Sequence, residues 1–433
     1  MKRTILWLLV LLILFPLALT GAERRESEEI VLTAMVRDYS LNYDTPWYTA
    51  AEKFSEKYPH VRIEFEGLPY NDQREKVLIT VGAERGPDIV MVDCIWLGEF
   101  ASNNILIDLT SRISAVPGLR DDYIESFQQS SKWNGIEYGL WLWTDVRMLS
   151  YNKDLFRAAG LDPNKPPATW AELRDYAKKL TNPATGVWGY AFPAFSTDHT
   201  ADRWYPFLYM AGGQILSDDY TRAAFNSEAG VQALQLLVDL MRNDKVSPTD
   251  LLGISESDVS NGFFTEKYAM QIKVGEFWAD FRDKGGLTFD EYKNKIGVAP
   301  LPVPPGGSIA TGSGGWLAAI TRDSKHPDLA FEYITMVVET YNMTEFLIKQ
   351  GAIPTRKSML ALEDRFLSAV PYFNVAAEVL PHTQFRPPIP EYSQISSEIV
   401  FAIQSALTGR AAPKAALDLA AQRVNAILDQ RKW

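Results

Sequence analysis

Cysteine and histidine are scarce in this chain of 433 residues, and their scarcity excludes several kinds of protein. Cys94 is the single cysteine, so no intramolecular disulfide can form and stability must come from the hydrophobic core. The histidines have none of the spacings that are typical of metal ligands, and we expect no zinc site, no other metal and no cofactor. They are His60, His199, His326 and His382.

The motifs of several enzyme classes are also missing. The chain has no G-x-S-x-G nucleophile elbow and no G-x-x-x-x-G-K-[ST] phosphate-binding loop. Residues 312–315 are rich in glycine, but they follow a proline-rich stretch and precede a predicted strand, whereas a phosphate loop follows a strand and opens a helix. We therefore expect no catalytic residues. The 54 aspartates and glutamates leave a carboxylate pair for glycoside hydrolysis open as an alternative.

Basic residues are outnumbered by acidic ones, and the formal net charge is −11. Nucleic-acid binding requires clustered Lys and Arg to neutralise the phosphates, so this excess of negative charge argues against a nucleic-acid partner. An anionic membrane surface is disfavoured for the same reason. The charge alone does not identify a ligand.

Long apolar runs are missing outside the N-terminus. Lys2 and Arg3 precede an apolar stretch over residues 5–19, and the small residues 20–22 follow it. This layout predicts a secretory signal cleaved near Ala22, because the run is shorter than the roughly 20 residues that span a bilayer. An uncleaved anchor is the alternative. No cysteine follows the signal to carry a lipid, and we expect a periplasmic protein.

Apolar residues in the first part of the chain follow an alternating pattern of strand and helix. Strands are predicted at residues 30–36, 61–65 and 89–92, with helices at residues 46–58 and 72–84 between them. This order is typical of a parallel α/β sheet.

The second part of the chain repeats this alternation. Thr169 and Glu172 form a capping box at the start of a helix, and Ser227 and Pro327 are predicted to begin two more. Further strands are predicted at residues 187–192, 268–272 and 316–321, and helices at residues 394–407 and 413–430. Residues 300–315, rich in Pro and Gly, suit a loop or a crossing between lobes. A chain of this length exceeds a single hydrophobic core, so two lobes are expected.

Tryptophan is abundant, with 12 residues, and several lie near predicted strand ends. Trp96 and Trp278 follow predicted strands, and Asp93 stands directly after the strand at residues 89–92. Ligands of open α/β sheets bind beyond the carboxyl ends of the strands. Sugars present C–H faces that pack on aromatic rings and hydroxyls that pair with Asp or Arg. The combination favours a carbohydrate ligand, with core packing as the alternative for each tryptophan.

Several short segments carry a specific sequence pattern. The most specific are YNKDLF at 151–156, AAGL at 158–161 and PATWAEL at 167–173; supporting segments are GPDIV at 86–90, NSEAG at 226–230, FTEKYAM at 264–270 and GAIP at 351–354. Together they resemble family 1 of the extracellular solute-binding proteins, the group that includes maltose-binding protein. Ser150 stands where the family usually has a bulky apolar or aromatic residue, and Leu140-Trp141 stands where many members have proline. The lipidated cysteine of many relatives is absent. These departures leave the identity of the ligand open.

The resemblance implies a periplasmic-binding-protein type II fold, with two α/β lobes, each a mostly parallel sheet flanked by helices, and a ligand cleft between them. The implied boundaries are a signal peptide at 1–22, an N-terminal lobe at 27–145 and 317–363, and a C-terminal lobe at 146–316 and 364–433. Crossing segments are expected near residues 143–147, 316 and 360–365. Family members close on the ligand by hinge bending, and a membrane permease recognises the closed form.

Carried over by position, the resemblance implies ligand-binding residues in both lobes and at the hinge. They are Asp44, Tyr70, Asp93 and Trp96 in the first lobe, Trp143 and Asp145 at the hinge, and Trp204, Trp278, Trp316, Arg386 and Tyr392 in the second lobe. Arg386 would fork onto vicinal hydroxyls or a sugar carboxylate, with a surface or inter-helix ion pair as the alternative.

The resemblance implies the substrate-binding component of an ABC-type importer. Its expected partners are a small carbohydrate ligand, either a mono- or oligosaccharide or a polyol, and the membrane permease subunits, and the chain itself is expected to be a monomer. A binding protein of the same fold for a polyamine, a peptide or an iron complex is one alternative. A secreted carbohydrate-active enzyme is another.

Overall fold

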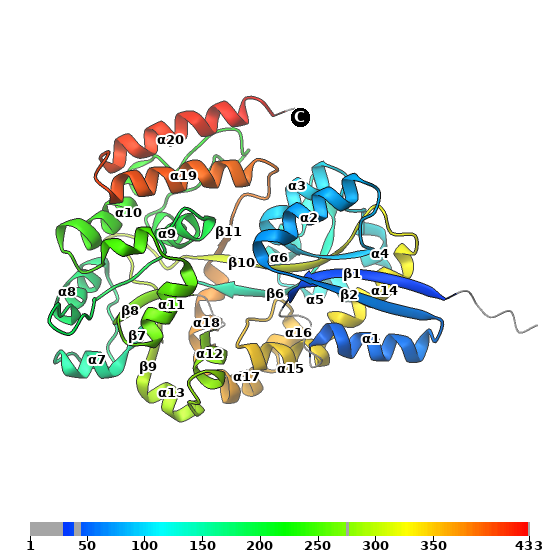
Figure 1. Ribbon diagram of the computed structural model, residues 1–433, viewed down its shortest axis with the longest axis horizontal. Coiled ribbons are helices and arrows are strands. Elements are labelled where there is room, and N and C mark those ends of the chain that lie inside the picture. The colour runs from blue at the N-terminus through cyan, green and yellow to red at the C-terminus, as the bar shows by residue number, and fades with distance from the viewer. Residues whose placement is uncertain (1–28, 39–44, 274–276, 432–433) are drawn as a thin grey trace, which may run out of the picture.

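The computed structural model describes residues 29–38, 45–273 and 277–431 and consists of two α/β lobes (Figure 1). The signal segment at residues 1–22 and the candidate Asp44 lie outside the described residues. Within the described ranges, no helix combines the length and the apolar character needed to cross a membrane.

The first lobe is built on a sheet whose strand order is β11-β10-β3-β1-β2, with β6 also paired to β10. Its strands are β1 (Ile30–Arg37), β2 (Val61–Leu68), β3 (Ile89–Asp93), β6 (Gly139–Val146), β10 (Thr311–Ile320) and β11 (Thr383–Phe385). β1 pairs in parallel with both β2 and β3, so the parallel sheet predicted for this part of the chain is confirmed. Every residue of β3 is buried, which agrees with its continuous apolar sequence.

Helices cover this sheet and continue around the lobe (Figure 1). They are α1 (Pro46–Lys57), α2 (Tyr70–Gly82), α3 (Leu97–Ser102), α4 (Thr110–Ala115), α5 (Leu119–Asp122), α6 (Glu125–Ser130), α14 (Pro327–Val337) and α15 (Thr340–Gln350). Pro46 and Pro327 open their helices as predicted, at a position where the missing N–H is not needed.

The second lobe contains a three-stranded sheet of order β8-β7-β9. Its strands are β7 (Met148–Asn152), β8 (Met270–Lys273) and β9 (Ile296–Ala299). β7 is antiparallel to both neighbours, so the mostly parallel sheet expected in each lobe is wrong for these strands. β7 lies in the middle of this sheet, and its chain direction is opposite to that of both β8 and β9.

Helices surround this second sheet, and two long ones close the chain. They are α7 (Lys153–Ala158), α8 (Trp170–Leu180), α9 (Asp198–Met210), α10 (Glu228–Val238), α11 (Glu256–Phe264), α12 (Phe277–Asp283), α13 (Phe289–Lys295), α19 (Tyr392–Leu407) and α20 (Pro413–Leu428). The capping box of Thr169 and Glu172 is present at α8, and the Ser227 side chain caps α10. Between the lobes lie α16 (Lys357–Leu360), α17 (Glu363–Ala369) and α18 (Phe373–Val379) (Figure 1).

Two predicted segments differ from the structure. Residues 187–192 form only isolated bridges, at Trp188 with Tyr268 and at Ala191 with Gln271, rather than a strand. Residues 311–315, for which a loop or a crossing between the lobes was expected, are not a loop but the first half of β10. Glycines allow this part of β10 to lie close against β6, where larger side chains would clash.

Gly315 shows this constraint most clearly. It has a φ of +134°, and a Cβ added there would lie 2.2 Å from the carbonyl oxygen of Trp143 on β6. The register between β6 and β10 also shifts immediately afterwards, between Trp316 and Leu317, as a bulge does. The backbone at this point therefore requires glycine.

We expect Gly315→Ala to lower the free energy of unfolding by about 1–3 kcal/mol, because it forces a strained backbone and a clash onto the β6–β10 pair. Urea unfolding followed by circular dichroism would measure it. Gly82→Ala is the matched control, since nothing lies within 4 Å of its added Cβ at the end of α2. Equal stabilities of the two variants would contradict this view of β10.

Candidate functional site

Three aromatic rings meet beside the carboxyl end of β3. Tyr70 is the first residue of α2, Trp96 ends the 3₁₀ turn after β3, and Trp316 belongs to β10. The ring centroid of Trp96 is 5.4 Å from that of Tyr70 and 5.7 Å from that of Trp316, the second pair meeting edge to face. The guanidinium of Arg37 lies 5.5 Å from the rings of both Tyr70 and Trp316. We call Tyr70, Trp96 and Trp316 the aromatic wall.

Asp93 lies behind this wall and holds it in position. Its Oδ2 accepts a hydrogen bond from the Tyr70 hydroxyl at 3.0 Å, and its Oδ1 accepts one from the Ile95 amide at 3.2 Å. Burial raises the pKa of the Asp93 carboxyl. Burial also raises the pKa of Tyr70 well above its usual value, and the nearby charge of Asp93 adds to the effect. Tyr70 therefore remains a proton donor at neutral pH.

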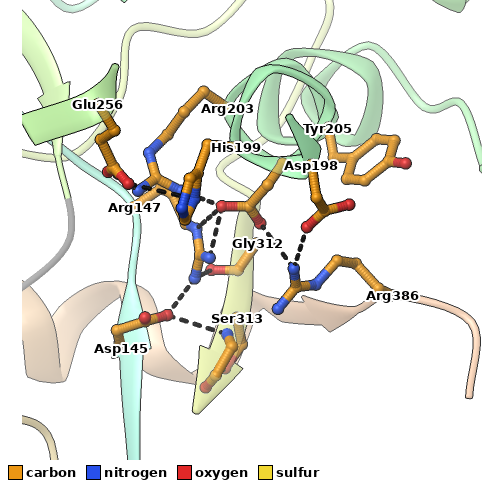
Figure 2. Close-up of polar contacts among 12 residues, drawn as sticks. Asp145, Arg147, Asp198, His199, Arg203, Tyr205, Glu256, Gly312, Ser313 and Arg386 are labelled. Atoms are coloured by element: carbon orange, nitrogen blue, oxygen red, sulfur yellow. Dashed lines mark hydrogen bonds and ion pairs between the residues drawn. The ribbon is translucent and has the colours of Figure 1, made fainter. Parts of the chain in front are cut away.

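Arg386 follows β11 and faces carboxylates from both lobes. Figure 2 shows its contact with Asp198 of the second lobe. Its Nη1 is 2.6 Å from Asp198 Oδ2 and 3.9 Å from Asp202 Oδ1, and its Nη2 is 3.8 Å from Asp93 Oδ1. The side chain of Arg386 is 8% exposed. Burial would lower its pKa, but the surrounding carboxylates outweigh burial and raise the pKa well above the usual value.

A second cluster of buried charges joins α9 to the crossing strands (Figure 2). Asp202 accepts hydrogen bonds from Arg147 Nε at 3.1 Å and Nη2 at 2.6 Å, and it also pairs with Arg203. Arg147 pairs in turn with Asp145, whose Oδ1 accepts a hydrogen bond from the Gly314 amide at 2.9 Å. Burial would raise the pKa of Asp202, but the adjacent guanidinium groups hold it well below its usual range.

Glu256, at the start of α11, extends this cluster to the edge of the second lobe. It pairs with Arg203, its Oε2 is 3.1 Å from His199 Nδ1, and its Oε1 is 4.0 Å from Lys273 Nζ. Its pKa is also held well below the usual value, because the nearby positive charges, that of Arg203 foremost, outweigh the effect of burial.

A cavity of about 350 Å³ lies between the aromatic wall and helices α9 and α19. Its volume is at the lower end of the roughly 300–1,000 Å³ found for small-molecule sites. Tyr70, Ile95 and Trp96 line it from the first lobe; Ser196, Thr197, Asp198, Tyr392, Ser393, Ser396, Ser397, Val400, Phe401 and Gln404 line it from the second. One side is therefore aromatic, and the other carries mostly hydroxyl groups.

The structure gathers most of the predicted site residues around this cavity. Tyr70, Trp96 and Tyr392 line it, Asp93 and Arg386 stand behind its walls, and Trp316 completes the aromatic wall. Asp145 belongs to the buried charge cluster near the crossing strands.

Three predicted tryptophans lie elsewhere. Trp143 is buried and packs against Phe346, with ring centroids 5.1 Å apart. Trp204 is fully buried within α9. Trp278 packs edge to face on Tyr292 at 5.1 Å and is absent from the cavity lining. Sequence position does not separate these core tryptophans from the wall, because Trp143 and Trp316 both lie within strands and only tertiary packing decides which ring faces the cavity.

Sequence reasoning identified Tyr392 but missed the rest of the cavity-facing side of α19. Tyr392, Ser396, Val400 and Gln404 recur every four residues, so they share one helix face, and all four line the cavity. Polar residues on a mostly apolar face were the available signal. His199 was also missed as a site residue; its ring lies 6.3 Å from that of Tyr70, across the gap between the lobes.

Among the described residues, no group of three or more His, Cys, Asp or Glu side chains could hold a metal ion. Asp93, Asp198 and Asp202 instead surround a guanidinium group.

Two lobes joined by crossing strands, with a cavity between them, define the class of two-lobed periplasmic binding proteins. The fold matches solved members of this class. The structure of an ABC transporter solute-binding protein from Thermotoga lettingae, bound with α-D-tagatose, has a TM-score of 0.82 and 29% identity and covers 92% of this chain and 100% of that chain. One from Agrobacterium radiobacter, in complex with ribitol, has a TM-score of 0.77 and 26% identity and covers 92% of this chain and 99% of that one.

Comparison of sequences leads to the same class. The arabinooligosaccharide-binding protein of Bacillus subtilis is 26% identical over 347 residues, which are 77% of this chain and 76% of that protein. The family model of the bacterial extracellular solute-binding proteins matches residues 40–340. The chain therefore belongs to the family of bacterial extracellular solute-binding proteins, and the predicted family is confirmed. The family and its structural neighbours are substrate-binding proteins of transporters rather than enzymes.

We expect Glu256→Gln to lower the free energy of unfolding at pH 7 by roughly 1.5–3 kcal/mol, because Arg203 loses a charged hydrogen-bond partner. The depressed pKa of Glu256 stabilises the fold above the unfolded pKa of about 4.3, and this contribution is lost as pH falls through the folded pKa. The difference between variant and parent should therefore shrink below about pH 4.

Chemical unfolding at a series of pH values would measure this difference. Asp175→Asn is the control, since Asp175 belongs to an exposed pair with Lys179 and should leave stability unchanged at every pH. If the difference in the free energy of unfolding between Glu256→Gln and the parent stayed constant from pH 7 to below pH 4, the depressed pKa of Glu256 would be contradicted.

Proposed function

We propose that this protein captures a carbohydrate, either a mono- or oligosaccharide or a polyol, between its two lobes and delivers it to the permease of an ABC-type importer. The observation that carries the proposal is the contrast between the two sides of the cavity. One side presents Tyr70 and Trp96, and the other presents serine and threonine hydroxyls with Gln404 and Asp198.

This arrangement matches the chemistry of a sugar. The C–H faces of a pyranose or polyol chain pack on aromatic rings, where each stacked pair contributes about 0.5–1.5 kcal/mol beyond the buried area. Its hydroxyls both donate and accept hydrogen bonds, as serine, threonine and glutamine side chains do. A stack and several hydrogen bonds supply enough free energy for micromolar binding, which requires about −8 kcal/mol.

The relatives support the same ligand class. The two solved proteins described above hold tagatose and ribitol, and the Bacillus subtilis relative is named for an arabinooligosaccharide. All three are 26–29% identical to this chain over at least three quarters of its length, so they support carbohydrate as the class without specifying which one.

Closure of the lobes would couple binding to transport. The cavity is lined from both lobes, so a ligand that fills it binds the closed form better than the open one and shifts the equilibrium toward closure. The pairing of β6 and β10 provides the connection about which the lobes would move. We further propose export to the periplasm by the N-terminal signal, as the sequence predicts.

A thermal-shift screen of sugars, polyols, polyamines, peptides and iron complexes tests the proposal directly. We expect a sugar or polyol to give the largest shift, because a ligand at 100 times its dissociation constant stabilises the folded state by about 2.7 kcal/mol. The same compound should be recovered unchanged after long incubation. A dominant shift with a polyamine, peptide or iron complex would point to another solute, and turnover would point to an enzyme.

We expect Trp96→Ala and Trp316→Ala each to weaken binding of the sugar found in that screen by more than tenfold, because each removes part of the aromatic wall. Isothermal titration calorimetry on the folded variants would measure the change. Trp188→Ala is the control, since Trp188, like Trp316, is partly exposed, but it pairs with Tyr268 outside the cavity lining. If both variants bound the sugar with the affinity of the parent, the aromatic wall would not be part of the binding site.

A further inference from the structure

Asp198 is the one charged side chain among the described residues that line the cavity. Its carboxylate is already engaged by the protein. Oδ2 accepts a hydrogen bond from Arg386 Nη1 at 2.6 Å, and Oδ1 accepts hydrogen bonds from the hydroxyls of Tyr392, at 2.8 Å, and Ser396. The lining around Asp198 consists of hydroxyl, amide, aromatic and aliphatic groups. The hydroxyl-rich side of the cavity therefore presents the Asp198 carboxylate, whose negative charge is paired with Arg386 behind it.

Arg386 supplies that partner without lining the cavity itself. Its side chain is almost fully buried, and its second nitrogen faces Asp93 of the first lobe. The resemblance implied that Arg386 forks onto vicinal hydroxyls or a sugar carboxylate, with an ion pair as the alternative. Protein carboxylates surround its guanidinium group here, which corresponds to the ion-pair alternative. Its charge reaches a ligand only through Asp198.

A paired carboxylate discriminates between ligands by charge. An ammonium group placed beside Asp198 would lose its hydration, and the Asp198 carboxylate, already paired with Arg386, would not make up for that loss. A ligand carboxylate at the same place would lie next to the negative charge of Asp198 and be repelled by it. A hydroxyl group avoids both problems, since it donates to a carboxylate oxygen and remains neutral.

We propose that Arg386 is the residue that sets the charge preference of the cavity: by compensating Asp198 from behind the wall, it selects uncharged polyhydroxylated ligands over amino- and carboxyl-bearing ones. Arg386 is thus a positioning residue that determines specificity. This inference rests on the proposed function, and it adds the charge of the ligand and the residue that decides it.

Matched sets of sugars test this proposal. Each set holds an uncharged hexose, its 2-amino analogue below the pKa of the amine, and its uronic acid, in the glucose, galactose and mannose series; maltose, D-tagatose and ribitol are further uncharged probes. We expect the parent protein to bind an uncharged member at least tenfold more tightly than its charged analogues, as measured by calorimetry.

Variants then move the preference in opposite directions. Arg386→Met leaves Asp198 uncompensated, so the affinity ratio of amino sugar to uncharged sugar should rise at least tenfold. Asp198→Asn removes the negative charge from the cavity lining and should shift the ratio toward the uronic acid. The double variant removes both charges and should restore the preference for the uncharged sugar, and Arg386→Lys should retain it.

Arg356→Met is the matched control. Arg356 is also a largely buried arginine paired with a carboxylate, that of Asp122, but it lies outside the cavity lining. Its loss should leave both affinity ratios unchanged in the folded protein, even where stability falls. If Arg386→Met does not fold, Asp198→Asn and Arg386→Lys still decide the question.

The outcomes separate this inference from the proposed function. Parent protein that binds an amino sugar or uronic acid as tightly as the uncharged member would overturn the role of Arg386 and leave carbohydrate capture intact. The same holds if the variants lower all affinities equally, since that is the result of a merely structural role. Failure of every sugar and polyol to bind would overturn the proposed function and this inference with it.

Discussion

The rest of the molecule depends on the pairing of β10 with three different strands. β10 is antiparallel to β3 and β6 and parallel to β11, so one strand joins segments that are far apart in the chain. Its pairing with β3 sets Trp316 opposite Asp93. Its pairing with β11 brings Arg386, the next residue along, to the carboxylates of α9. Both walls of the cavity are therefore positioned by the same strand.

Buried charge is the second constraint at this junction. Four cationic side chains, Arg147, Arg203, Lys273 and Arg386, face the carboxylates of Asp93, Asp145, Asp198, Asp202 and Glu256. Two unit charges about 4 Å apart interact by about 4 kcal/mol at an effective dielectric constant of 20, so no member could be buried without a partner. The near balance of charge allows a polar junction between the lobes and keeps the cavity lining almost neutral.

The two sides of the cavity differ because different kinds of element build them. The aromatic wall stands on β10, a 3₁₀ turn after β3 and the first residue of α2, which hold their rings in edge-to-face contact. The hydroxyl-rich side stands on α9 and α19, where residues four apart share one face. A rigid aromatic surface opposite a row of small polar side chains suits a ligand with both C–H faces and hydroxyl groups.

Local pattern was sufficient for much of the fold. The strands of the first lobe, the capping box of α8, the proline-initiated helices and α20 were predictable, because periodicity and caps are encoded within a few neighbouring residues. The position of Asp93 at a strand end was predictable for the same reason. For residues 311–315 the sequence left a loop and a crossing segment open, because glycine content is a local signal, whereas their role in β10 depends on a close neighbour from a distant segment.

Local sequence signals therefore identify the family and the type of fold, and they supply the aromatic and polar residue types from which the cavity is built. The tertiary structure alone decided which tryptophans face the cavity and which lie in the core, and that Arg386 faces Asp198 rather than a ligand. The physical reason is distance along the chain: Arg386 and Asp198 are 188 residues apart, and only the pairing of β10 and β11 brings them within hydrogen-bonding reach.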